Sequence, residues 1–147
     1  MFDDLKSMRT PDGHAAVEFH DSTLVRIQRQ DADRTLVLDA YVHRSAGTPG
    51  TSPGSGWSQA VHLYCRRARI LPSEPTLPLL LADGVLTTQR VVLENVVPVP
   101  SSFSGQVHLE LVGCDGERIV VDAECIELAA DGEPTYVDEF AGHLEEP

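Results

Sequence analysis

Residues 22–44 read STLVRIQRQDADRTLVLDAYVHR, and this stretch decides the predicted fold. In its second half, apolar side chains occupy every other position, which is the two-residue period of a β-strand that buries one face. These side chains are Leu36, Leu38, Ala40 and Val42. The polar residues 31–34 between the two halves are typical of a turn. The stretch therefore predicts an antiparallel hairpin with strands at 22–30 and 35–44.

Two of the predicted strands lose this alternation once. Leu24 and Ile27 both favour a core but lie three positions apart, so strict alternation cannot bury both. The strand predicted at 118–128 changes parity in the same way. Its first core residues occupy odd positions and its last core residues occupy even positions: Ile119, Val121 and Ala123, then Ile126 and Leu128. A β-bulge inserts a residue and restores the buried face, so we expect bulges near 25–26 and 124–125.

Turn signals divide the rest of the chain into further short strands. Asp-Gly is a strong hairpin signal, and it occurs at 12–13, 83–84, 115–116 and 131–132. Between these and other turns we expect strands at 57–70, 79–82, 85–88, 91–97, 106–112, 118–128 and 135–140, an extended crossing at 72–78 and a helical turn at 138–145. About eight strands with almost no helical periodicity predict a single all-β domain over 1–147. We expect an antiparallel β-sandwich or open barrel with little helix.

One segment has the composition of a loop. Residues 46–56 read AGTPGTSPGSG, with four glycines and two prolines. Such a stretch buries too little apolar surface to offset the entropy lost on ordering, so we expect a flexible loop. Its glycines do not form G-x-G-x-x-G, and the chain has no phosphate-binding G-x-x-x-x-G-K-[ST] motif. We therefore predict no cofactor.

The charge of the chain is strongly negative and unevenly distributed. Eleven lysines and arginines oppose 23 aspartates and glutamates, for a net charge of −12. Residues 115–147 hold eleven of these acids and a single base, Arg118. An acidic surface repels phosphate backbones and anionic head groups, so we expect neither a nucleic-acid nor a membrane partner. The acidic C-terminal third is most simply explained by solvated strand faces and a soluble tail, and the alternatives are a face for a basic protein or one of two self-complementary patches.

The sequence also favours a cytoplasmic location. The N-terminal residues lack the basic-then-apolar pattern of a secretory signal, and no apolar run reaches the ~18 residues that a membrane span needs. The three cysteines form no C-x-x-C motif: Cys65, Cys114 and Cys125. We expect all three to be reduced and mostly buried.

His20, Asp21 and Ser22 are the three residue types of a hydrolytic triad, but they are consecutive. Neighbouring side chains of a strand point to opposite faces, so we expect no relay among them and no catalytic residues. Asp21 or Ser22 is expected instead to bond the local backbone. The six histidines have no H-x-H or H-x-x-x-H spacing, so we predict no metal site. We expect three of them on outward strand faces: His43, His62 and His108.

The first strand opens with the pattern F-H-D-S-x-L-x-x-I, from Phe19 to Ile27, and a Leu-x-Leu strand follows. This opening, with the closing segments 105–111 and 132–140, resembles small uncharacterised bacterial all-β domains. Similar F-H-D openings occur in some immunity proteins of bacterial toxin systems. The resemblance implies a cytoplasmic β-domain and supplies no catalytic residues.

Three functions follow as hypotheses. The first is a non-catalytic binding module whose acidic face, including Asp138 and Glu139, meets a basic protein, as an immunity-like inhibitor would. The second is a metal-assisted hydrolase or isomerase that uses His20 and Asp21 with a histidine from another strand. The third is self-association between the acidic face and a basic cluster formed by Arg66, Arg67 and Arg69.

Overall fold

The computed structural model describes residues 14–49 and 51–140 as nine β-strands without a helix. The strands are β1 (His14–Gln30), β2 (Asp33–Ser45), β3 (Gly54–Arg66), β4 (Arg69–Leu71), β5 (Leu79–Thr87), β6 (Val92–Glu94), β7 (Val96–Pro98), β8 (Ser101–Gly113) and β9 (Arg118–Phe140). The described part of the chain contains no helix with the length and apolarity that crossing a bilayer requires. The predicted all-β fold is confirmed. The turn predicted at 12–13 and residues 141–145 of the helical turn predicted at 138–145 lie outside the described residues, and the helical turn is wrong for 138–140, which belong to β9.

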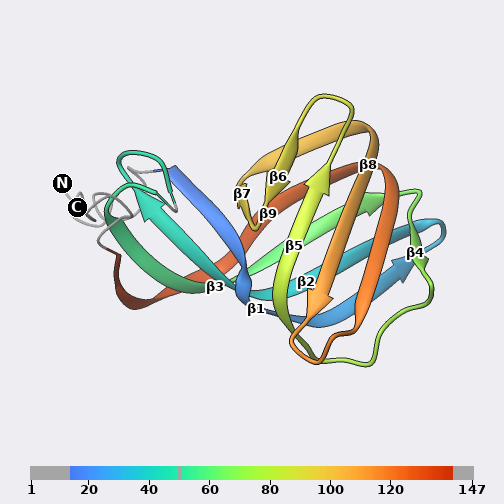
Figure 1. Cartoon of the computed structure of the whole chain (residues 1–147), viewed down its shortest axis with the longest axis horizontal. Coiled ribbons are helices and arrows are strands. Elements are labelled where there is room, and N and C mark those ends of the chain that lie inside the picture. The colour runs from blue at the N-terminus through green and yellow to red at the C-terminus, as the bar shows by residue number, and fades with distance from the viewer. Residues whose placement is uncertain (1–13, 50, 141–147) are drawn as a thin grey trace.

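All nine strands belong to one antiparallel sheet (Figure 1). Its order is β6-β5-β8-β9-β3-β2-β1-β7, and β4 pairs with β9. Thr23 and Leu24 of β1 also pair with β5, so that β1, β5, β8, β9, β3 and β2 form a closed ring of paired strands. Both walls of the core are therefore parts of one continuous sheet.

The core fills this ring and follows the predicted alternation. Leu36 and Leu38 of β2 are fully buried, as are Leu63 of β3 and Leu109 of β8. Each buried leucine contributes about 1.5–3 kcal/mol relative to an exposed one. The even positions of 36–42 all lie in the core, which confirms the predicted inward face of this strand.

The bulge predicted near 25–26 is confirmed, whereas the extra residue predicted near 124–125 of β9 lies instead in the neighbouring strand β8. The register of β1 on β2 shifts between Leu24 and Arg26. The register of β8 on β9 shifts opposite Glu124, where Gly105 and Gln106 have φ of 82° and 74°. The core residues of β9 on both sides of this irregularity are all buried: Ile119, Val121, Ala123, Ile126 and Leu128.

The hairpin predicted around Asp83 and Gly84 is wrong. β5 continues through both residues, and the register on β8 shifts between Leu81 and Asp83. Gly84 is needed for packing here, because a Cβ at this position would lie 2.6 Å from the ring of the buried Phe19. Asp131 and Gly132 likewise lie inside β9, whereas the Asp115-Gly116 turn is confirmed.

Two other predicted boundaries differ from the structure. The loop predicted at 46–56 ends earlier, because Gly54 and Gly56 belong to β3 and pair with β9. A Cβ at Gly56 would overlap the Tyr41 side chain, so this glycine permits a close approach between neighbouring strands. The strand predicted at 91–97 is divided into β6 and β7 at Asn95, whose φ is 65°.

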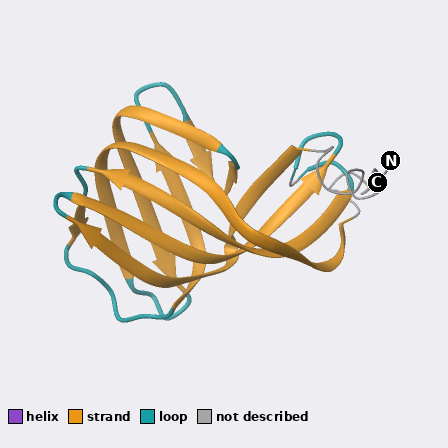
Figure 2. Cartoon of the chain, turned by 180° about the vertical axis from the view of Figure 1, so that it is seen from behind, coloured by secondary structure: helices purple, strands orange, loops and turns teal. Residues whose placement is uncertain are grey.

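Part of the sheet projects from the ring as an arm (Figures 1 and 2). We define the arm as residues 14–18, 41–45, 54–58 and 131–140, which belong to β1, β2, β3 and β9 and pair in that order. The short strand β7 covers the outer edge of β1 at 16–18. In the described part of the chain, residues 129–140 of β9 pair with β3 alone.

The three cysteines are free thiols in three environments. Cys65 is 1% exposed, and burial raises its pKa to about 12, so its reactive thiolate is suppressed. Cys125 is partly buried and Cys114 is exposed. The expectation of mostly buried thiols is therefore wrong for Cys114, which lies in the turn between β8 and β9.

The first prediction concerns Gly84. Gly84→Ala places a methyl group against the Phe19 ring and should lower the free energy of unfolding by about 1–3 kcal/mol. Denaturant unfolding of this variant, of Phe19→Leu and of the double variant measures the coupling. The double variant should lose less stability than the sum of the single losses. Strict additivity would show that the two residues do not compete for space.

The second prediction concerns thiol chemistry. A maleimide reagent should modify Cys114 of the native protein first and leave Cys65 unmodified until the protein unfolds. Mass spectrometry of the peptides after timed labelling measures the order. Cys114→Ser should remove the fast phase. Modification of Cys65 at the rate of Cys114 would contradict the burial described above.

Candidate functional site

The arm joins the ring at an irregular segment of β1. Glu18 pairs with Tyr41 and Thr23 pairs with Asp39, so residues 19–22 of β1 lie opposite the single residue Ala40 of β2. Asp21 has φ of 82°, a conformation that aspartate tolerates better than most residues. The extra residues separate buried from exposed side chains: Phe19 and Ser22 point inward, whereas His20 and Asp21 face solvent.

Two side chains satisfy the backbone at this segment. The Ser22 hydroxyl donates to the carbonyl of Glu18 at 2.6 Å and accepts from the amide of Tyr41 at 3.0 Å. Asn95 accepts from the amides of Phe19 and His20, through its carbonyl and its side-chain oxygen, both at 2.8 Å. Ser22 therefore has the backbone-bonding role that the sequence predicted for Asp21 or Ser22.

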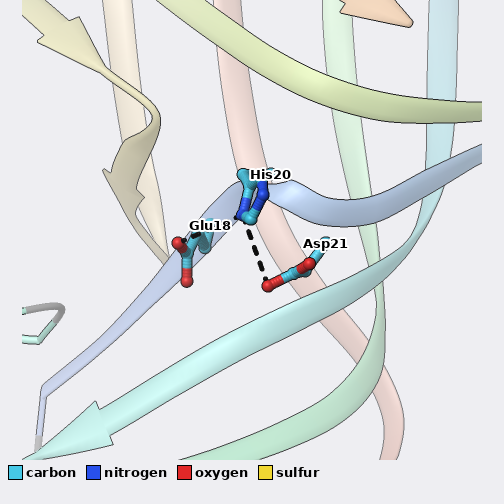
Figure 3. A group of neighbouring side chains, drawn as sticks. All are labelled: Glu18, His20 and Asp21. Atoms are coloured by element: carbon cyan, nitrogen blue, oxygen red, sulfur yellow. Dashed lines mark ion pairs between the residues drawn. The ribbon is translucent and has the colours of Figure 1, made fainter. Parts of the chain in front are cut away.

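Glu18, His20 and Asp21 converge at the base of the arm, and we call them the neck triad (Figure 3). His20 Nδ1 lies 3.4 Å from Asp21 Oδ2 and 3.8 Å from Glu18 Oε2. The side chains of His20 and Asp21 are more than half exposed, whereas that of Glu18 is 20% exposed. The expectation that His20 and Asp21 point apart is wrong, because the positive φ of Asp21 interrupts the alternation. Ser22 does point away, so no hydrolytic relay forms.

Glu18 connects the neck triad to a buried histidine. Its Oε1 lies 2.7 Å from His43 Nε2, and its Oε2 accepts from Asn95 Nδ2 at 3.2 Å. The hydrogen bond with His43 lowers the pKa of Glu18, against the opposing effect of burial. His43 was predicted on an outward strand face and therefore exposed to solvent. This is wrong, because the residue is only 3% exposed. Its ring packs edge-on against Tyr41, with centroids 5.0 Å apart.

Tyr41 connects His43 with Asp138 on the opposite side of the arm. The Tyr41 hydroxyl donates to Asp138 Oδ1 at 2.7 Å. Burial raises the pKa of Tyr41, and the hydrogen bond and negative charge of Asp138 raise it further, with smaller contributions from Glu18 and Asp21. Asp138, one of the predicted binding residues, therefore lies in the same electrostatic environment as the neck triad.

Glu139 and its neighbours form the exposed edge of the arm. The Glu139 carboxylate accepts from the Tyr136 hydroxyl at 2.8 Å, and Tyr136 packs edge-on against Trp57. Tyr136 and Val137 are each 49% exposed. We call the unpaired side of β9 over residues 129–140 the free edge. Four carboxylates occur along it: Asp131, Glu133, Asp138 and Glu139.

The predicted basic cluster lies at the other end of the molecule, around β4 (Figure 1). Arg67 and Arg69 line an open groove of about 480 Å³, whereas Arg66 lines a different hollow. Arg67 Nη1 lies 3.4 Å from Glu124, and His108 in the same groove contacts Asp122 at 2.7 Å. The structure therefore does not bring the three arginines together in one site, nor next to Asp138 and Glu139.

Sequence reasoning missed Glu18, Tyr41, His43 and Asn95. The spacing Glu18-x-His20 was a usable signal, because residues two apart on a strand share a face. The contribution of Asn95 had no such signal, since it lies 75 residues from His20 along the chain. The remaining outward histidine, His62, contacts Asp131 at 3.6 Å.

The third prediction concerns the contact between Glu18 and His43. Glu18→Gln should lower the free energy of unfolding by about 1–2 kcal/mol at pH 7, because the ionised hydrogen bond is lost. A lowered folded pKa stabilises the protein above the ordinary value of 4.5, and this contribution disappears as the pH falls through the folded pKa. Denaturant unfolding measured from pH 7 downward should show the free energies of unfolding of wild type and Glu18→Gln converging below pH 4.5.

Glu133→Gln is the matched control for this prediction, because Glu133 is an exposed glutamate of β9. It should change the free energy of unfolding little at either pH. A loss in Glu18→Gln that is the same at neutral and acidic pH would contradict an ionised Glu18 in the folded protein.

Comparisons with known proteins supply no family for this arrangement. The chain matches no protein-family model, and no curated protein or solved structure is significantly similar to it. No functional residue can therefore be carried over from a relative. The roles of the neck triad and the free edge depend on the geometry described above.

Proposed function

We propose that this protein is a non-catalytic interaction module that binds a basic, extended segment of a partner protein along the free edge. The observation that carries the proposal is the acidic, unpaired side of β9 over residues 129–140. An immunity-like inhibitor that covers a basic protein is one class of molecule that would use such an edge. The location we propose is cytoplasmic.

The backbone of the free edge supports strand addition. Over 129–140 the described residues offer β9 a partner on the β3 side only, so outward N–H and C=O groups are available on both sides of the irregular residues 132–134, where Pro134 has no N–H and the Gly132 carbonyl accepts from Gln59. An extended peptide can pair with such groups and extend the sheet, which gives affinity without a deep pocket. The partner segment is therefore proposed to be extended.

The free edge is held in place before any partner arrives. Gln59, which is 7% exposed, donates from Nε2 to the carbonyl of Gly132 at 2.7 Å. The contacts of Tyr136 with Trp57 and of Asp138 with Tyr41 anchor the last residues of β9. An ordered edge loses little conformational entropy on binding, which favours affinity.

Charge selects the partner. Residues 129–140 contain four carboxylates and neither lysine nor arginine. Two copies of this edge would bring eight carboxylates together, so the charge opposes symmetric pairing of two copies and favours a basic strand. Tyr136 and Val137 add exposed apolar surface for alternate side chains of the partner.

The fourth prediction tests strand addition with defined peptides. A fluorescent peptide of alternating lysine and valine should bind, and its glutamate–valine counterpart should not, because only the first complements the edge. The same basic peptide methylated at alternate backbone nitrogens should bind much more weakly, because it lacks the N–H donors for strand pairing. Fluorescence anisotropy measures all three peptides at about 0.05 M and about 0.5 M salt, and salt should weaken the binding.

Charge reversal then locates the site. Glu133→Lys with Glu139→Lys should abolish binding of the basic peptide, since both residues lie on the free edge. The control reverses the same number of charges at two exposed residues elsewhere, Glu94→Lys with Glu127→Lys. Equal losses in the two double variants, or equal binding of the methylated peptide, would reject the free edge as the binding surface.

A further inference from the structure

We infer that the neck triad is a binding site for one divalent transition-metal ion. Glu18, His20 and Asp21 each offer a ligand atom, and these atoms lie within 4.8 Å of one another. Two ligands of one tetrahedral zinc ion, each at about 2.0–2.2 Å from the metal, are separated by roughly 3.4 Å. The separations of 3.4 Å and 3.8 Å from His20 Nδ1 to the two carboxylates match this geometry.

The same separations are too long for direct hydrogen bonds. An N–H donor and an oxygen acceptor normally approach to about 2.7–3.2 Å, as Glu18 and His43 do at 2.7 Å. His20 therefore lies within ion-pair distance of both carboxylates but forms a short hydrogen bond with neither. An ion between the three side chains would be in contact with all of them.

The local charge also favours a cation. Three carboxylates from β1 and β9 lie close enough together for their negative charges all to raise the pKa of Tyr41: Glu18, Asp21 and Asp138. Within residues 14–49 and 51–140, the contacts of these carboxylates are with histidine, tyrosine and asparagine, and no lysine or arginine pairs with them. A bound cation would compensate this negative charge.

The surroundings orient the carboxylate of Glu18 and keep the site open. His43 and Asn95 each contact one of its two oxygens, and metal-ligating carboxylates are commonly held by such hydrogen bonds. His20 and Asp21 also line a hollow of about 230 Å³, together with residues of β5 and the turn after β8. Glu18 does not line this hollow, but the side chains of His20 and Asp21 are more than half exposed, so three protein ligands leave room for a water molecule as the fourth ligand.

The donor set indicates which ion binds. One imidazole nitrogen with two carboxylate oxygens suits zinc and its neighbours in the transition series. Calcium takes six to eight oxygen ligands, which three side chains with one nitrogen do not supply. We therefore expect zinc or cobalt to bind and calcium not to compete.

Isothermal titration calorimetry of the full chain with zinc chloride tests the site. The wild type should bind one zinc ion that is lost in His20→Ala, and excess calcium should leave the titration unchanged. Asp21→Asn should weaken zinc binding by at least about tenfold, because substituting even a residue that only supports a metal ligand typically costs that much in affinity. Asparagine tolerates the φ of 82°, so this variant keeps the backbone, and circular dichroism checks both folds.

His108→Ala is the matched control. His108 is half exposed and contacts Asp122, so it is an imidazole–carboxylate pair outside the neck triad. The zinc affinity of His108→Ala should equal that of the wild type. Added cobalt should give visible absorption bands in the wild type and in His108→Ala, and these bands should be missing in His20→Ala. Zinc binding that survives His20→Ala and Asp21→Asn, or is lost in His108→Ala, would overturn the inference. Peptide binding to the free edge is measured without metal, so each proposal can fail alone.

Discussion

The irregular segment of β1 is the constraint on which both the ring and the arm depend. Residues 19–22 occupy the space opposite a single residue of β2, so β1 bends sharply and joins two differently directed parts of the sheet. Beyond the bend, Thr23 and Leu24 reach β5 and close the ring. Before it, residues 16–18 pair with β7 and form the edge of the arm.

This bend also produces the polar face of the arm. A regular strand would place His20 and Asp21 on opposite faces, whereas the positive φ of Asp21 brings both next to Glu18. Glu18 in turn contacts His43, and Tyr41 reaches Asp138 of β9. The neck triad and the acidic free edge are thus connected through two hydrogen bonds and the ring contact between His43 and Tyr41, although they suit different ligands: a metal ion and a basic strand.

The parts of the fold that were predictable share a local cause. The alternation at 36–42 and the parity changes near 25 and 124 are properties of a few adjacent residues, because a pleat turns successive side chains to opposite faces. Asp83-Gly84 failed as a hairpin signal because its glycine is required by Phe19, a contact between β1 and β5. His43 was misjudged for a related reason: strand parity states which face a side chain occupies, and Glu18 and Tyr41 cover that face.

The amino-acid sequence by itself determined the all-β class, the inward faces of the long strands, the bulge of β1 and the acidic character of the C-terminal third. These follow from short-range periodicity and composition, which need no knowledge of the partners of a strand. Only the tertiary structure decided the closure of the ring, the free edge of β9, the convergence of the neck triad and the contacts of Asn95 with Glu18 and His20. Strand order and the contacts of Asn95 depend on residues far apart in the chain and leave no local pattern, whereas the neck triad converges because Asp21 adopts a positive φ that alternation does not predict.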